Sequence, residues 1–173
     1  QYANSKPFGK IRTMQSQAGY AGGALPQSNW RMQKAMGGGA LYDMGIYCVN
    51  GVRFMSKLEP IAVTARHEKT HPKFIEVDET TYFTLEFEQG ISAECGTSVV
   101  KNMNGLKIDC EDGWYQLSPM QSYSGVAGKD SLGVNLTPFP GNQQARQMDN
   151  DSLALMGKGP FLTNAEVAIK DIH

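Results

Sequence analysis

Two side chains that can handle a proton, those of Asp43 and Tyr47, lie four residues apart in an apolar segment of the chain. Residues with this spacing stack on one face of a helix, so both side chains can point into a single site. Three glycines, Gly37 to Gly39, precede them and leave room for a chain segment or a ligand to approach the backbone closely. A helix that starts there also offers unpaired N–H groups to an anion or a polar substrate. The pattern predicts a site that orients and deprotonates a hydroxyl.

A purely structural interpretation of the same pair exists. An acid at position 43, near a helix start, stabilises the helix by interacting with its dipole. Tyr47 can be a core aromatic residue whose hydroxyl reaches the edge of the core. Catalysis needs a further group, because a tyrosine with a pKa of about 10 acts as a base only when a nearby cation lowers that pKa.

Composition excludes several classes of protein. At 173 residues the chain fits one domain with a real core. Its net charge of −1 comes from interspersed acids and bases, so we expect no nucleic-acid and no membrane partner. The three cysteines form no Cys-x-x-Cys pair and suit buried thiols. His67 and His71 lie four apart in a loop-like segment without a nearby third ligand, so we predict no metal site.

The elements that must position the site begin with a strand and a helix. Residues 10–19 predict a strand, 21–29 a loop, and about 38–56 a helix. The helix is expected to bury the apolar residues at three- and four-residue spacing, namely Leu41, Met44, Cys48, Val52 and Met55.

Period-two patterns follow the helix. They predict strands over 60–66, 80–88 and 91–99, the last two joined by a tight turn at Gln89-Gly90. Residues 106–111 and 114–118 predict a second hairpin through Asp112-Gly113, with type I′ chemistry. Three acids at a strand start predict a solvated edge: Glu76, Asp78 and Glu79.

The last third of the chain predicts one strand and two helices. Residues 122–140 are rich in Gly, Ser and Pro and predict a strand plus a long loop, and 142–156 predict a helix. Thr163 and Glu166 form a capping box for a final helix, which is short enough that we expect truncation or disorder beyond His173. This order is typical of an α+β fold: a two-layer domain with an open, largely antiparallel sheet and helices on one face.

The string from Trp30 to Tyr47 resembles the signature of the glucose–fructose oxidoreductase and inositol dehydrogenase (Gfo/Idh/MocA) family of nicotinamide-dependent sugar oxidoreductases. The shared pattern is Trp-Arg, a spacer, then Gly-Gly-Gly-Ala-Leu-x-Asp-x-Gly-x-Tyr. The tyrosine variant, followed by Cys-Val-Asn-Gly-Val-Arg, is most similar to the glucose–fructose oxidoreductase branch. Weaker similarity runs from about Gly9 to the last residue. The resemblance implies that residues 1–173 are the C-terminal substrate-binding and oligomerisation domain, truncated at both ends.

A Rossmann domain should precede this one in the family, and no Gly-x-Gly-x-x-Gly follows a predicted strand in the sequence. The resemblance therefore implies that the absent N-terminal domain binds most of the cofactor, NAD or NADP. It also implies that this domain supplies the activating lysine, in a Glu-Lys-Pro motif. Ser5-Lys6-Pro7 lies too close to the glycine triplet to be that motif, and we expect Lys6 at the surface.

The resemblance implies hydride transfer from a sugar or polyol hydroxyl. Tyr47 would accept the proton, and Asp43 would orient the substrate or Tyr47. The residues expected to face the cofactor are Trp30, Arg31, Gly38 and Gly39. An equally good interpretation of Trp30 and Arg31 is structural: Trp30 would be a hydrophobic anchor and Arg31 a solvated charge.

The family also implies a homo-oligomer formed through the sheet. Strand 80–88 places Tyr82, Thr84 and Glu86 on one face and apolar residues on the other, and only one face can pack on helices. The alternative function is a non-catalytic binding or assembly module that shares the fold. An upstream Rossmann unit with a Lys-Pro motif would favour the enzyme over the assembly module. The chain alone is expected to be inactive. Cytoplasmic and periplasmic locations both stay open.

Overall fold

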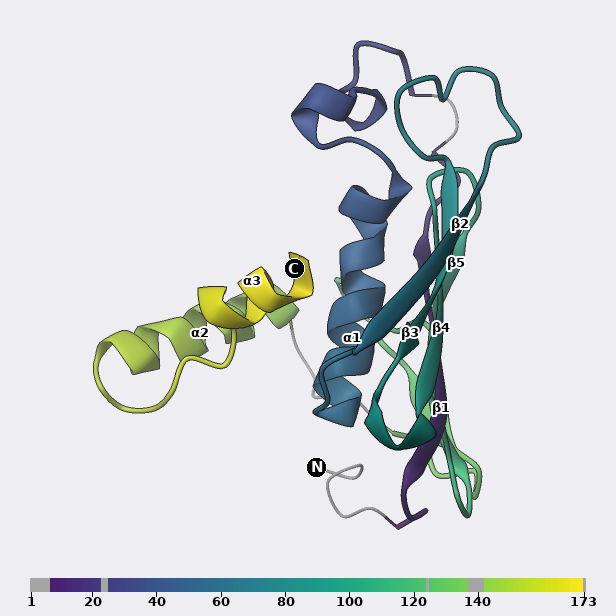
Figure 1. The fold of residues 1–173 in the computed structure, drawn as a ribbon. Helices are drawn as coiled ribbons and strands as arrows, with labels where there is room; N and C mark the ends of the chain where they lie inside the picture. Colours follow the sequence, from purple (N-terminus) through teal and green to yellow (C-terminus); the bar gives the residue numbers. More distant parts are fainter. Residues whose placement is uncertain (1–6, 23–24, 124, 137–141, 173) are drawn as a thin grey trace.

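A computed structural model describes residues 7–22, 25–123, 125–136 and 142–172 of the chain. A seven-stranded sheet forms one layer, and a helix packs along one of its faces (Figure 1). The strands are β1 (Ile11–Gly19), β2 (Ala62–Glu68), β3 (Thr80–Glu86), β4 (Ser92–Ser98), β5 (Met103–Cys110), β6 (Trp114–Leu117) and β7 (Gly128–Asp130). The helices are α1 (Ile46–Ser56), α2 (Gln143–Leu155) and α3 (Ala165–Ile172). The shorter turns are η2 (Trp30–Met32), η3 (Lys34–Met36), η4 (Leu41–Gly45) and η5 (Glu88–Gly90).

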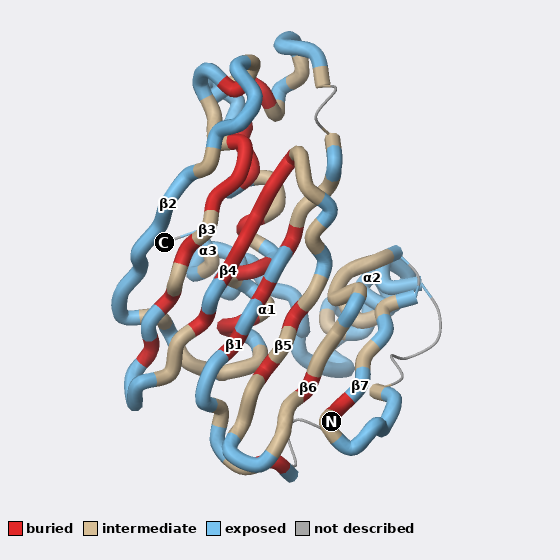
Figure 2. Tube along the Cα trace, turned by 90° about the vertical axis from the view of Figure 1, so that its right-hand side faces the viewer, coloured by how far each residue is buried: buried red, intermediate tan, exposed pale blue. Residues whose placement is uncertain are grey.

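The strand order is β2-β3-β4-β1-β5-β6-β7, and every neighbouring pair is antiparallel except β1 with β4. The parallel pair arises because β1 lies between β4 and β5. Figure 2 looks onto the face of the sheet that α1 leaves uncovered, with the helices behind. This architecture confirms the predicted α+β class, with a largely antiparallel open sheet and helices on one side.

The main core lies between α1 and the centre of the sheet. Alternation along β1 turns Met14, Ser16 and Ala18 toward the helix, while α1 contributes Cys48 and Val52. Burying such side chains contributes roughly 1.5–3 kcal/mol for each large apolar residue. Of the five residues predicted on the buried face of the helix, Cys48 and Val52 are buried and Met44 and Met55 pack partly buried against the core. The prediction is wrong at Leu41, which is 37% exposed.

Leu41 lines an apolar groove beside β2, an edge strand whose residues are mostly exposed. A smaller apolar cluster lies above the main core and supports the loop before α1. It consists of Met32, Ala40, Phe74 and Val99, with partly buried neighbours that include Tyr20.

Both predicted hairpins form, but only one has the predicted turn. Gln89 (φ 65°) and Gly90 (φ 73°) adopt the left-handed conformation of a type I′ turn. Neither Asp112 nor Gly113 has a positive φ, so the type I′ prediction for the second hairpin is wrong. Tertiary contacts set that turn instead: the Asp112 N–H donates to the Phe8 carbonyl (3.1 Å), and a Cβ on Gly113 would lie 2.6 Å from the Phe8 ring.

The C-terminal helices form as predicted and lie on the α1 side of the sheet (Figure 1). No residue of α2 is buried. The cap of α3 is Asn164, whose Oδ1 accepts from the Val167 N–H (3.0 Å), so the predicted capping box at Thr163 is one residue off. Strand β7 lies within the predicted 122–140 segment, while Lys6 and residues 137–140 fall outside the described part. None of the described helices is long and apolar enough to cross a membrane.

Candidate functional site

The glycine triplet, Gly37 to Gly39, lets the η2 turn pack closely against the chain just before η4, where the helical segment formed by η4 and α1 begins. A Cβ on Gly38 would lie 2.5 Å from the carbonyl oxygen of Arg31 and 2.7 Å from that of Trp30. The Gly39 N–H donates to the same Arg31 carbonyl (2.9 Å), and Gly39 has φ +109°. The sequence predicted that the glycines leave room for either a chain segment or a ligand. At Gly38 the space is taken by a chain segment, the backbone of Trp30 and Arg31.

Asp78 occupies the N–H groups at the start of this helix. The Ala40 N–H donates to the Asp78 carbonyl (3.1 Å), and the Leu41 N–H donates to Asp78 Oδ2 (2.9 Å). A Cβ on Gly39 would collide with the same carboxylate. The prediction that this helix start offers free N–H groups to an anion is wrong for these two groups, because the backbone carbonyl and the side-chain carboxylate of Asp78 already bind them.

The neighbouring Glu79 is completely buried. It accepts hydrogen bonds from the Thr70 N–H (2.9 Å), the Thr70 hydroxyl (2.7 Å) and the His71 N–H (2.8 Å). Burial opposes its ionisation, but these hydrogen bonds outweigh burial and hold the pKa of Glu79 below its usual value. The prediction of a solvated acidic edge is therefore wrong for Asp78 and Glu79, whose hydrogen bonds hold the site segment and the 69–79 loop, whereas Glu76 is exposed as predicted.

Asp43 lies in a π-helical turn, η4, immediately before α1. The turn is held by the Thr97 hydroxyl, which donates to the Ala40 carbonyl (2.9 Å), and by close packing of Gly45, where a Cβ would lie 3.5 Å from Thr97 Cγ2. π-Helical turns are rare in proteins overall, and those that occur are often found at functional sites. The sequence predicted a continuous α-helix here.

The Asp43 carboxylate is bound by two side chains from distant parts of the chain. Arg31 Nε donates to Asp43 Oδ2 at 2.8 Å, and the Tyr20 hydroxyl donates to the same oxygen at 2.9 Å. The Arg31 guanidinium also lies over the Trp30 ring, 4.3 Å from its centroid. The structure thus brings Trp30, Arg31 and Asp43 together, with Gly38 packed against the backbone of the first two.

Tyr20 was not among the residues singled out from the sequence. It directly follows β1, where its N–H donates to the Ser98 carbonyl (3.0 Å). Burial, and then the hydrogen bond to Asp43, raise the pKa of Tyr20 to about 12. It is therefore a hydrogen-bond donor near neutral pH. Its only local signal is its place just after a strand, which does not reveal a partner 23 residues away.

Tyr47 lies one helical turn after Asp43 and is 49% exposed. In the part of the chain that the structure describes, its hydroxyl makes no hydrogen bond, so the two predicted catalytic residues are not joined to each other. Trp30, whose ring contacts the Arg31 guanidinium, is 40% exposed. The site therefore combines two exposed aromatic residues with one anchored carboxylate that is only slightly exposed.

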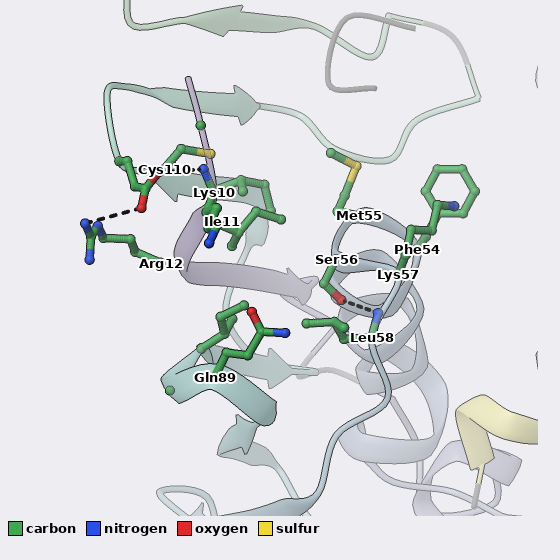
Figure 3. Close-up of a pocket in the computed structure, with 15 residues that line it drawn as sticks. Lys10, Ile11, Arg12, Phe54, Met55, Ser56, Lys57, Leu58, Gln89 and Cys110 are labelled. Atoms are coloured by element: carbon green, nitrogen blue, oxygen red, sulfur yellow. Dashed lines mark hydrogen bonds and ion pairs between the residues drawn. The ribbon is translucent and has the colours of Figure 1, made fainter. Parts of the chain in front are cut away.

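A separate cavity of about 780 Å³ lies at the opposite end of α1 (Figure 3). It is lined by the last residues of that helix, including Phe54 and Met55, by Lys10 just before β1, and by Arg12 at the start of that strand. The 11-residue helix α1 separates this cavity from Asp43 by about 16 Å along its axis. The cavity belongs to the far end of the domain.

The two histidines make local contacts. His67 Nδ1 lies 2.8 Å from the Thr81 hydroxyl, and His71 Nδ1 accepts from the Lys73 N–H (3.2 Å). Among the described residues, no three His, Cys, Asp or Glu side chains are grouped so that they could hold a metal ion.

Solved structures of similar fold are oxidoreductases. An aldose-aldose oxidoreductase from Caulobacter crescentus, in complex with glycerol, shares 30% identity with a TM-score of 0.85 over 98% of this chain and 52% of its own length. A UDP-N-acetylglucosamine 3-dehydrogenase from Acidithiobacillus ferrooxidans (13% identity, TM-score 0.73) covers 99% of this chain and 54% of its own length. A myo-inositol 2-dehydrogenase from Lactobacillus plantarum (16% identity, TM-score 0.71) covers 98% and 53%. At such low identity, the last two show the fold alone.

The chain spans about half the length of these proteins. Residues 1–116 match the sequence model described as the GFO/IDH/MocA C-terminal domain. This match covers more than half of the chain and includes the Trp30–Tyr47 string, so the chain belongs to the GFO/IDH/MocA family of oxidoreductases.

Proposed function

We propose that residues 1–173 are the C-terminal substrate-binding and dimerisation domain of an NAD(P)-dependent oxidoreductase that acts on a sugar or polyol hydroxyl. The observation that carries the proposal is the Asp43 carboxylate, anchored at a π-helical turn by Arg31 and Tyr20 with a free phenol at Tyr47 one turn away. The aldose named for the similar structure of 30% identity supports this substrate class.

In this proposal Tyr47 accepts the proton of the substrate hydroxyl and Asp43 orients that substrate. A phenol accepts a proton near neutral pH only beside a cation. Within the described residues no ion pair, hydrogen bond or cation–π contact joins a basic side chain to Tyr47. The proposal therefore assigns the cation to the preceding domain, and the chain alone is expected to be inactive.

NAD or NADP, when bound, would supply the hydride acceptor. The exposed Trp30 ring and the partly exposed Arg31 guanidinium fit contact with one edge of such a cofactor. Gly38 and Gly39 fit less well, because the Trp30–Arg31 backbone and Asp78 already fill the space beside them. The described sheet has one parallel pair, unlike the parallel sheet of a dinucleotide fold, so we assign most cofactor contacts to the other domain.

The test is Tyr47→Phe in the full-length protein, with Tyr123→Phe as a matched control at an exposed position. Tyr47→Phe is expected to lower kcat about 10²–10⁴-fold with little change in KM or Tm, because only the proton acceptor is removed. Turnover within about threefold of wild type, at unchanged Tm, would assign Tyr47 to packing. A full-length protein without any turnover would favour the assembly-module alternative.

We also propose that the uncovered face of the sheet mediates dimerisation. Tyr82 on this face lies under the Arg66 guanidinium (4.4 Å to the ring centroid) and accepts a hydrogen bond from Lys101 Nζ at its hydroxyl (3.2 Å). Glu68 pairs with both cations, at 2.7 and 2.8 Å. Tyrosine and arginine are enriched in protein interfaces, which supports a contact here.

Light scattering tests the dimer. The native protein is expected to be a dimer at tens of micromolar, and Thr84→Arg, which places a charge beside Tyr82 on the same face, is expected to yield monomer. Gln144→Arg on the exposed helix α2 is the control and should leave the mass unchanged. A monomeric native protein would refute the proposed dimer.

A further inference from the structure

One oxygen of the Asp43 carboxylate accepts both of the hydrogen bonds that hold this side chain. Tyr20 and Arg31 each donate to Oδ2, at 2.9 and 2.8 Å. No donor from the described part of the chain binds Oδ1. The Asp43 side chain is 12% exposed. Among the described residues, the buried side-chain oxygens that lack a hydrogen-bond partner do not include Oδ1 of Asp43. This oxygen, which has no partner among those residues, is therefore accessible to solvent.

The two donors are themselves fixed. Arg31 is held by stacking on Trp30 and by its N–H, which donates to the Asn29 side chain (3.0 Å). Tyr20 is held by its N–H bond to the Ser98 carbonyl and by packing against the cluster that contains Met32 and Phe74. A carboxylate bound at one oxygen by two such donors cannot rotate about its Cβ–Cγ bond without losing both charge-assisted hydrogen bonds.

We infer that Tyr20 is a positioning residue: together with Arg31 it holds Oδ2 of Asp43 and thereby presents Oδ1 as the acceptor for a substrate hydroxyl. This inference rests on the proposed function of Asp43. The raised pKa of Tyr20 agrees with a permanent donor role and separates it from Tyr47, the proposed proton acceptor. Without the Tyr20 hydroxyl, Arg31 alone binds the carboxylate, Oδ1 loses its fixed direction, and fewer bound substrates have the reactive orientation.

A double-mutant cycle in the full-length enzyme tests the inference. The variants are Tyr20→Phe, Asp43→Asn and the two combined, with Tyr123→Phe as the control. Tyr20→Phe is expected to lower kcat about ten- to a hundredfold with a smaller change in KM, the size expected for one hydrogen bond to a charged group. In the Asp43→Asn background the same substitution is expected to change kcat less than about threefold, because the neutral amide oxygen accepts a weaker hydrogen bond from Tyr20 and the charge-assisted bond through which Tyr20 acts is already lost.

The possible outcomes separate this inference from the proposed function. Equal losses of kcat in both backgrounds, or no loss in the native background, would overturn the role of Tyr20 while leaving that of Asp43 intact. An Asp43→Asn variant with native kcat would overturn both.

A second pair of variants serves if Tyr20→Phe lowers the yield of folded enzyme. Tyr20→His keeps a ring N–H donor and is expected to turn over at least about tenfold faster than Tyr20→Leu. Equal rates for these two variants would also overturn the inference.

Discussion

Replacing Glu79 by glutamine is expected to loosen the loop that supports the start of the site helix. The native carboxylate is fully buried and accepts three hydrogen bonds, from the N–H and hydroxyl of Thr70 and the N–H of His71. Glutamine has the same size but only one acceptor oxygen, so it cannot accept all three of these hydrogen bonds. At least one hydrogen bond to the carboxylate is then lost, and the remaining bonds lose their charge assistance.

The expected loss in the free energy of unfolding is about 2–4 kcal/mol, from the loss of one hydrogen bond to a charged group and the weakening of the two others. For a chain of this size, with about 2–4 °C per kcal/mol, this lowers Tm by roughly 4–16 °C. The loss should depend on pH. The folded-state pKa of Glu79 is lowered, so the ionised group stabilises the fold above the unfolded-state pKa of about 4.3. This stabilisation is lost as pH falls through the lower, folded-state value.

Thermal and urea unfolding of the purified protein between pH 7 and pH 3 would measure both effects. Glu88→Gln, at an exposed turn position, is the control and should change stability by no more than about 0.5 kcal/mol. A Glu79→Gln variant with native Tm at pH 7 would refute the reasoning. So would a difference between native and variant that grows on acidification, because that sign requires a raised pKa.

Three further outcomes are expected. Gly39→Ala should lower the free energy of unfolding, measured in urea, by about 1–3 kcal/mol, because the new Cβ would combine a positive φ with a collision with Asp78. Gly37→Ala also has a positive φ but open space around it, so its loss should be smaller. Equal losses for the two variants would contradict the collision. Arg53→Met should release α3, because the buried guanidinium pairs with Asp171 on that helix, and limited proteolysis should then cut α3 faster than in the native protein. The isolated 173-residue chain should bind NAD or NADP more weakly than about 100 μM (roughly −5.5 kcal/mol), and tighter binding by calorimetry would show that the chain holds a dinucleotide by itself.

Local patterns allowed much of the fold to be predicted. Alternation in residues 80–88 correctly assigned Phe83, Leu85 and Phe87 to the buried face, because side chains of a strand alternate whatever the rest of the chain does. Gln89-Gly90 gave the right turn, because the left-handed conformation is a local property. The string from Trp30 to Tyr47 identified the family, and with it Asp43 and Arg31, which the structure joins.

Contacts between distant segments could not be predicted in this way. Whether Asp78 was a solvated acid or a helix cap depended on the position of a loop 37 residues after Leu41. The turn at Gly113 was decided by Phe8, about a hundred residues earlier in the chain, and not by its own Asp-Gly sequence.

The candidate site shows the same division. The sequence by itself singled out the residues that we propose carry the chemistry, since Asp43, Tyr47 and the glycines form a continuous pattern. Only the tertiary structure decided that Tyr20, at the end of β1, would reach Asp43, and that both donors would bind one carboxylate oxygen. The physical reason is that residue type and spacing encode conformation over a few residues, whereas the direction of a carboxylate is set by side chains that meet only when the sheet has assembled.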